Sequence, residues 1–410
     1  MKKIVIFSII GFLSLGAIAQ KNYNTPQKVY YAKAKSYFLS KPLRDLPVAD
    51  NKKEDEEREI KNNLRRNEHI NPNALPVGPD PVWQNTNGTK AAAPPIQNWE
   101  GIQTWAFPPD PSGAAGPNHY VQMVNTKYAI YDKSGNLLGG PYNLNQLLGT
   151  SNDGDPIVLY DKFADRWFLS QFQTGNNEIV IGISQTNDPL GQYHVYTFQF
   201  NSFPDYPKYA IWTDGYYMTA NMGQQNAVAF ERDKMLVGDP SAGMIALTFP
   251  NLYTNGFFSA LPCDVDGNTL PPAGTPEYFF YFNDDGWGQY PQDALRVYQM
   301  TVDWNNPNNS TIVLSQTIPV SPFDSEFTST WDDIEQPGTS QRLDGVPGAI
   351  MYRAQYRSWG TYNTVVLNHT VDVDGTDHAG IRWYELRDAN DGNFSVYQEG
   401  TYAPDADNRW

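Results

Sequence analysis

The feature that most constrains the fold is a short unit, an acid and a proline followed by an aromatic-rich run, that recurs along the chain. It reads "DPIVLYDKFADRW" from Asp155 and "DYPKYAIWTDGYY" from Asp205, and looser copies begin at Asp344 and Asp110. The offset of about fifty residues, with roughly four strands in each unit, is typical of β-propellers. A β-sandwich, the main rival, would not easily produce an acid, proline and strand at this spacing.

The texture of the chain from about residue 99 onward agrees with this interpretation. Short runs rich in Tyr, Phe, Trp, Val and Ile alternate with Gly, Pro, Asn and Asp, and no long amphipathic helix separates them. We expect an all-β propeller of four-stranded blades with a period of about 45–70 residues. Five partial blades are visible, and they begin near residues 105, 155, 205, 276 and 343.

The N-terminus predicts export. Lys2 and Lys3 precede an apolar run that ends in the small-x-small pattern "AIA", which a signal peptidase reads. The protein is therefore expected outside the cell or on its surface, with no membrane insertion after cleavage. The predicted organisation is a signal peptide at 1–19, a charged, partly helical or disordered pre-domain with a Pro-rich linker at 20–98, and the propeller at 99–410.

Composition excludes several classes of partner. The chain has 45 acidic and 29 basic residues and a net charge of −16, so it offers no bulk positive surface for nucleic acid. Its one cysteine, Cys263, excludes an intramolecular disulfide and is expected to be a small buried residue. No phosphate-binding or dinucleotide loop is present, so no cofactor is predicted.

The repeated acids are the candidate catalytic residues. The first strand of each propeller blade lines the central channel, so acids just before those strands should converge at one mouth. This argument selects Asp155, Asp205 and Asp344 as catalytic candidates and Asp110 as a ligand-binding candidate. Glycoside hydrolysis needs two carboxyl groups roughly 5–9 Å apart. An Asp that holds a turn by accepting backbone N–H bonds would repeat in the same way, and this structural interpretation is favoured.

Two further groups are ligand-binding candidates. Trp287 and Tyr290 lie in the loop "NDDGWGQY", where an exposed aromatic ring could stack on a sugar. Arg353 and Arg357 have the even spacing that places side chains on one strand face, where they could grip a carboxylate. Pairing of these arginines with neighbouring acids is the favoured alternative.

Calcium is the one metal left open, on weak grounds. "DVDGN" offers Asp264 and Asp266, and "DVDGTD" offers Asp372 and Asp374, as oxygen ligands at alternating positions. Neither segment has the glycine placement or the distal Glu of a complete calcium loop, and ordinary Asp-Gly turns would look the same. The sequence therefore predicts no metal site.

Several long segments resemble a known group of proteins. They are "PPDPSGAAGPNHYVQMVN", "DGDPIVLYDKFADRWFLSQF", "FPDYPKYAIWTDGYYMTAN", "AFERDKMLVGDP", "PGTSQRLDG", "MYRAQYR", "GIRWYELRD" and "QEGTYAPDADNRW". Together they are similar to exported bacterial β-propeller proteins, of the secreted and surface type found in Bacteroidota, that have no established activity. The resemblance covers residues 99–410. It implies the propeller fold, a place outside the cell, and a domain that is incomplete at its C-terminus.

These observations favour a secreted or cell-surface propeller that acts as a binding or scaffolding module, with a glycan or surface polymer as its ligand. The first alternative is a glycan-cleaving hydrolase or lyase, sialidase-like or glycosidase-like, with its acids at the channel mouth. The second is a protein-binding propeller, which should expose an apolar patch. An enzyme should bring carboxylates with separated pKa values together in a cleft, whereas a scaffold should bond each Asp to its own turn.

Overall fold

The computed structural model describes residues 28–49, 69–89, 93–106, 108–252, 260–328 and 334–407. The predicted signal peptide, the charged stretch at 50–66 and the terminal Arg409 and Trp410 lie outside these residues. Within them, no helix is long and apolar enough to cross a membrane.

Antiparallel four-stranded blades follow one another along the chain, and the first three form separate sheets. Blade 1 consists of β4 (Ser112–Ala115), β5 (His119–Val124), β6 (Lys127–Asp132) and β7 (Leu137–Asn143). Blade 2 consists of β8 (Ile157–Asp161), β9 (Arg166–Gln173), β10 (Glu178–Ser184) and β11 (Tyr193–Gln199). Blade 3 consists of β12 (Asp205–Ile211), β13 (Tyr216–Asn221), β14 (Ala227–Phe230) and β15 (Gly243–Leu247).

The last two blades share one sheet, because their first strands pair in parallel. Blade 4 consists of β16 (Leu261–Asp266), β17 (Glu277–Asn283), β18 (Ala294–Thr301) and β19 (Thr311–Pro319). Blade 5 consists of β20 (Ala354–Ser358), β21 (Asn363–Asp372), β22 (Ala379–Asp388) and β23 (Ser395–Tyr402).

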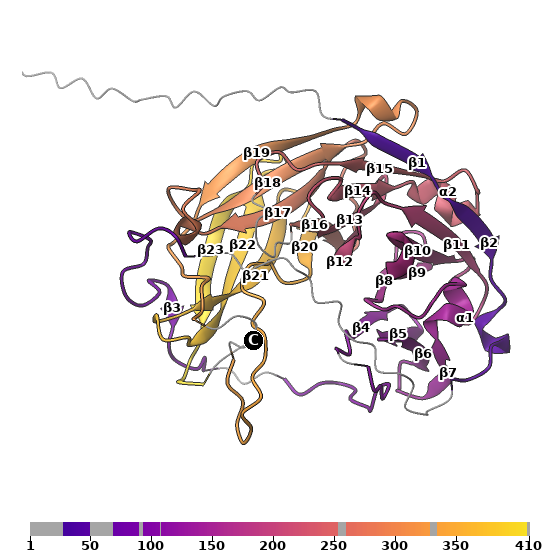
Figure 1. Cartoon of the computed structure of the whole chain (residues 1–410), viewed down its shortest axis with the longest axis horizontal. Helices are drawn as coiled ribbons and strands as arrows, with labels where there is room; N and C mark the ends of the chain where they lie inside the picture. Colours follow the sequence, from indigo (N-terminus) through magenta and orange to yellow (C-terminus); the bar gives the residue numbers. More distant parts are fainter. Residues whose placement is uncertain are drawn as a thin grey trace, which may run out of the picture.

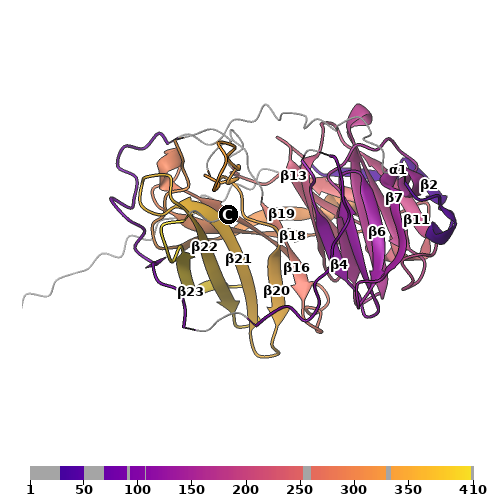
Figure 2. The ribbon, with the colours of Figure 1, turned by 90° about the horizontal axis from the view of Figure 1, so that it is seen from below.

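The blades are arranged around a centre, with their first strands innermost (Figure 1). Contacts run in order from β4 to β8, β12, β16 and β20, and Figure 2 shows the blades edge on. The predicted all-β propeller with five visible blades is therefore confirmed.

Two predicted blade boundaries differ from the structure. Blade 4 begins with β16 at Leu261, and the predicted start near residue 276 is its second strand. The sequence "LPCDVD" does not predict this first strand, because a proline and two acids are typical of a turn. Blade 5 begins at Ala354, so residues 320–353 make the interval before it longer than the predicted period.

Three strands from the N-terminal segment extend the outer edges of the blades. β1 (Tyr30–Lys33) pairs with β15, β2 (Ser36–Leu39) pairs with β11, and β3 (Trp83–Gln84) pairs with β23. Between β1 and β2 the chain passes from blade 3 to blade 2, as Figure 1 shows. The sequence analysis did not predict these strands, whose pairing covers three exposed sheet edges.

The hydrophobic core lies between neighbouring blades. One cluster joins blades 1 and 2, a second joins blades 2 and 3, and the largest joins blades 3, 4 and 5. Cys263 is fully buried in the largest cluster, as predicted, and burial raises the pKa of its thiol. The helical segments are short: η1 (Leu43–Asp45), α1 (Leu144–Leu148), η2 (Thr174–Asn176), α2 (Arg232–Val237), η3 (Asp285–Trp287) and η4 (Pro307–Asn309).

Candidate functional site

Four blades begin with the same unusual backbone feature. Asp110, Asp155, Tyr206 and Val346 each stand directly before a proline, and each has a positive φ, between 38° and 55°. A residue before proline normally adopts an extended conformation, so left-handed backbone at this position is strained. The fold therefore imposes this turn ahead of the inner strand whatever side chain occupies it.

This register corrects the predicted repeat. The residues structurally equivalent to Asp155 are Tyr206 and Val346, whereas Asp205 and Asp344 stand one and two residues earlier in their turns. Only Asp110 and Asp155 place an acid at the strained position itself. Because valine and tyrosine occupy the same position in other blades, the turn does not require a carboxylate there.

A short hydrogen-bond network joins Asp110 to Asp155. Asn125, at the end of β5, donates from Nδ2 to Asp110 Oδ2 over 2.7 Å, and its Oδ1 accepts from the backbone N–H of Asp155 over 2.9 Å. The two carboxyl side chains are also hydrogen-bonded to each other. Burial raises the pKa of Asp155 well above its ordinary value, and the nearby Asp110 raises it further. Both effects favour the protonated form of Asp155.

Lys208 and Asp205, both on β12, complete this cluster. The Nζ of Lys208 lies 3.3 Å from the centre of the Tyr206 ring. Burial lowers the pKa of Lys208 to about 8, although Asp155, Asp110 and Asp205 oppose that shift. Asp205 in turn raises the pKa of Asp155, and Lys208 lowers it. These side chains are partly exposed at the surface, yet the surrounding protein is dense enough to desolvate them.

The four predicted acids do converge. Burial raises the pKa of Tyr206, and the charges of Asp155, Asp110, Asp344 and Asp205 add to that effect. Asp344 also accepts the backbone N–H of Val346 over 2.8 Å, which is the turn-holding bond of the structural interpretation. We call Asp110, Asp155, Asp205 and Lys208 the channel-mouth cluster.

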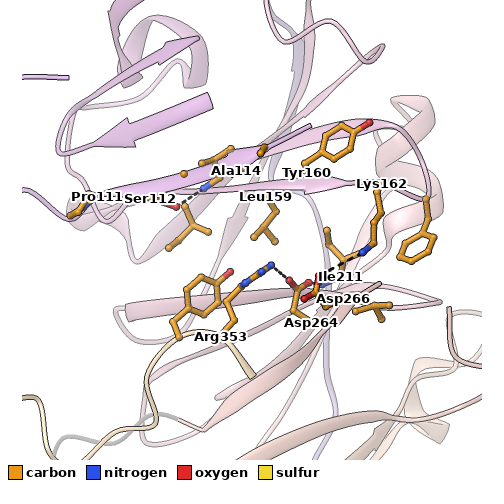
Figure 3. A pocket seen from close by; sticks show the side chains of 17 residues that line it. Pro111, Ser112, Ala114, Leu159, Tyr160, Lys162, Ile211, Asp264, Asp266 and Arg353 are labelled. Atoms are coloured by element: carbon orange, nitrogen blue, oxygen red, sulfur yellow. Dashed lines mark hydrogen bonds and ion pairs between the residues drawn. The ribbon is translucent and has the colours of Figure 1, made fainter. Parts of the chain in front are cut away.

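A cavity of about 510 Å³ lies along the inner strands, and none of the four residues of the channel-mouth cluster lines it. Its lining begins at Pro111 and Ile157, close to Asp110 and Asp155 in the chain. Figure 3 shows two charge pairs inside it. Arg353 donates to Asp264, and Lys162 Nζ lies 3.8 Å from Asp266.

The other predicted ligand-binding residues differ in burial and in their contacts. Trp287 is buried, with 1% of its surface exposed, and its Nε1 donates to Glu326 over 2.8 Å, so its prediction as an exposed loop aromatic is wrong. Loop η3 folds it onto the core of blade 4. Tyr290 is half-buried and donates from its hydroxyl to Asn251 O over 3.1 Å. Arg357 is exposed and stacks over the ring of Trp359.

The weak calcium candidates are held by protein partners. Asp264 and Asp266 face the cations described above. Asp372 accepts from the backbone N–H groups of Asp374, Gly375 and Asp377, as in an ordinary turn. Asp374 accepts from Thr376 over 2.6 Å. The segment at 372–377 therefore forms the Asp-Gly turn that the sequence left open, whereas Asp264 and Asp266 lie at the end of β16 and pair with cations.

The sequence analysis missed a cluster of three buried carboxylates, Asp284, Asp285 and Asp293, whose oxygens lie within 4.8 Å of one another. Oxygen ligands at this spacing suit a hard cation. Burial raises the pKa of Asp284 to about 6 and that of Asp293 to about 8. The backbone already supplies these carboxylates with N–H donors, from Gly286 to Asp284 at 2.6 Å and from Phe323 to Asp293 at 2.7 Å. We call these three residues the buried triad.

Sequence reasoning missed Lys208, a member of the channel-mouth cluster, and Asn125, which bridges Asp110 and Asp155. An alignment of the blades on the proline would have made Tyr206 equivalent to Asp155 and would have indicated Lys208, two residues later, as a candidate. Asn125 carries no such signal, because its role depends on β5 ending beside the start of β8.

Comparisons with known proteins give fold-level likeness only. No protein-family model matches the chain, and no curated protein matches it. A GH43 β-1,3-galactosidase structure is 13% identical with a TM-score of 0.30, covering 80% of this chain and 64% of that one. The WD40 domain of fission yeast SCAP is 10% identical with a TM-score of 0.32, covering 69% and 56%. A Bacteroides ovatus glycosyl hydrolase is 10% identical with a TM-score of 0.27, covering 67% and 83%. Scores this low carry no inference about activity.

Proposed function

We propose that the channel mouth is the active site of a glycan-cleaving hydrolase. One observation carries the proposal: Asp155 and Asp110 put hydrogen-bonded carboxyl groups at a strained backbone position that other blades fill with tyrosine or valine. Strained positions and perturbed carboxyl pKa values both concentrate at functional sites. This favours an enzyme over the binding module that the sequence favoured.

The chemistry follows from the protonation states. Asp155, acting in the protonated form that its raised pKa favours, gives its proton to the glycosidic oxygen as the bond to the anomeric carbon breaks. A water molecule adds to that carbon and gives a proton to the carboxylate of Asp205, so the products are two shorter sugars. Asp110 keeps Asp155 protonated, and Lys208 balances the negative charge of the acids. The reaction needs no cofactor.

A buried amide beside Asp205 supports a polar ligand at the same mouth. Asn221 is the direct cross-strand partner of Asp205 and is only 7% exposed. Its amide oxygen and nitrogen have no hydrogen-bond partner in the described part of the chain. Buried polar groups are normally satisfied, and sugar hydroxyls can both donate and accept.

Mass spectrometry of polysaccharides incubated with the protein tests the proposal. We expect new oligosaccharides from at least one plant, algal or bacterial polysaccharide with the unaltered protein. Asp155→Asn and Asp205→Asn should abolish them, whereas the matched control Asp344→Asn should not, because Asp344 holds its own turn. Intact polymers across the whole panel would contradict the hydrolase and return the binding module to first place.

We also propose that the protein works outside the cell, as residues 1–19 predict. Fractionation of cells that express the full chain should find it in the medium or on the surface. Recovery of an uncleaved chain from the cytoplasm would contradict this.

A further inference from the structure

The cavity along the inner strands has balanced charges. It is lined by two cations, Lys162 and Arg353, and two carboxylates, Asp264 and Asp266. Each cation lies beside one carboxylate, as Figure 3 shows. With all four side chains ionised, the cavity therefore has no net charge, although the protein as a whole is acidic.

The inner pair, Arg353 and Asp264, is locked in place. Asp264 is 3% exposed and accepts the backbone N–H of Ile211 over 2.9 Å as well as the guanidinium. About a third of the Arg353 side chain, 33%, stays exposed, and a guanidinium carries five N–H donors. The pair thus leaves donors of Arg353 for a ligand while Asp264 stays neutralised.

This arrangement discriminates between ligands by charge. A carboxylate or sulfate only accepts hydrogen bonds, so on the remaining donors of Arg353 its negative charge would lie close to the buried Asp264 carboxylate, and two like charges at short range repel each other. A cationic ligand would compete with Arg353 for Asp264. A hydroxyl both donates and accepts, so it can join the pair without breaking it.

We propose that this cavity is a subsite for neutral sugar units and that the Arg353–Asp264 pair excludes acidic sugars from it. The volume of about 510 Å³ lies within the usual range of small-ligand pockets. Ile157, Leu159 and Ile211 supply apolar wall for the C–H faces of a sugar ring. The inference rests on the proposed glycan activity and specifies its substrate class.

The test is calorimetric binding with the full-length Asp155→Asn protein, which should not cut its ligand. The probes are neutral hexasaccharides (cellohexaose, xylohexaose and mannohexaose), hexagalacturonate and the cationic hexamer of glucosamine. We expect at least one neutral probe to bind at least tenfold more tightly than either charged probe. Tighter binding of a charged probe, or no binding of any neutral probe, would overturn the inference.

A second test uses a variant that should gain affinity, because misfolding cannot explain a gain. Asp264→Asn keeps an oxygen for the Ile211 N–H but frees Arg353, so affinity for hexagalacturonate should rise about tenfold while neutral affinity falls. Asp233→Asn is the matched control, because Asp233 lies on α2, its side chain is 87% exposed and it does not line the cavity, and it should change both affinities less than threefold. An unchanged preference in folded Asp264→Asn protein contradicts the inference.

The two proposals can fail separately. If the unaltered protein binds neutral probes in this cavity but never cuts them, the hydrolase is wrong and the subsite stands. If it cuts only uronate-containing polymers, the hydrolase stands and the neutral subsite is wrong.

Discussion

The described part of the chain contains the buried triad and the three aspartates of the channel-mouth cluster, and the carboxylates of these two groups have different hydrogen-bond partners. In the buried triad, the oxygens of Asp284 and Asp293 accept backbone N–H bonds from the loops around them. At the channel mouth, Asp155 is bonded to another carboxyl group, Asp110, and lies beside a lysine. Both groups contain acids with raised pKa values, so the pKa shift alone does not identify a functional site.

The difference lies in what the carboxylate does for the chain. The triad ties the loop after β17 to the segment around residues 323–325 and to Leu75 in the N-terminal segment, so each acid has a structural task. The strained turn before β8 is also built with valine or tyrosine elsewhere in the ring. The carboxyl groups of the mouth are therefore available for chemistry, whereas those of the triad are committed to the fold.

Asp155→Asn should produce the largest effect and should act on catalysis alone. The amide cannot supply the proton, so we expect cleavage to fall by roughly 100-fold or more, the usual contribution of a general acid. Initial rates on the best polysaccharide substrate measure this, with thermal unfolding to confirm that the fold is retained. A loss of less than tenfold in folded protein would place the proton donor elsewhere.

Asp284→Asn should do the reverse and act on stability alone. The new amide group cannot accept every hydrogen bond that Gly286 and Ser325 now donate, so we expect a loss of about 1–3 kcal/mol in the free energy of unfolding. Urea denaturation measures it. The rate of polysaccharide cleavage per folded molecule should match that of the unaltered protein. A parallel loss of this rate would contradict the claim that the triad acts on stability alone.

The triad should also make stability depend on pH. Asp284 and Asp293 have raised folded pKa values of about 6 and about 8, so the folded state binds more protons than the unfolded state above about pH 4. Stability should therefore fall as pH rises from 5 to 8, by about 1–2 kcal/mol after allowance for relaxation. Denaturation at several pH values tests this, with Asp284→Asn expected to flatten the slope. A rise in stability across this range would contradict the shifts.

Lys208→Met should give the smallest and most specific effect, on the pH profile of cleavage. Asp155 acts in its protonated form, so activity is lost as pH rises through its pKa, and Lys208 lowers that pKa. Removing the lysine should move the alkaline limb of kcat/KM to higher pH by roughly half to one unit. A limb that stays in place or moves to lower pH would show that Lys208 does not act on Asp155.

The sequence predicted the repeated architecture better than the site. The period of the acid, proline and strand unit was sufficient to predict an all-β propeller, because each blade repeats the same strand pattern. It missed β16, whose proline and acids resemble a turn, and β1 to β3, which are too short to show a pattern and form because sheet edges are available to them. Trp287 was placed wrongly because loop composition does not show that η3 folds inward.

At the mouth, the sequence predicted that acids converge but not which ones matter. Asp110 and Asp155 differ from Asp205 and Asp344 in their exact place before the proline, which becomes visible once backbone φ values are known. The network through Asn125 and the charge of Lys208 depend on contacts between blades. Such contacts have no local signature in a single sequence.

The central claim is that Asp155 is protonated at neutral pH, and a carboxyl titration tests it most directly. The protein, labelled with ¹³C at aspartate side chains, would be followed by NMR from pH 3 to 9 beside the Asp155→Asn variant. The account predicts one resonance that titrates well above the ordinary aspartate range, is absent from the variant, and shifts when Asp110 is replaced by Asn. If the resonance lost in the variant titrates near the ordinary value, Asp155 is ionised at neutral pH and the proposed proton donor is wrong.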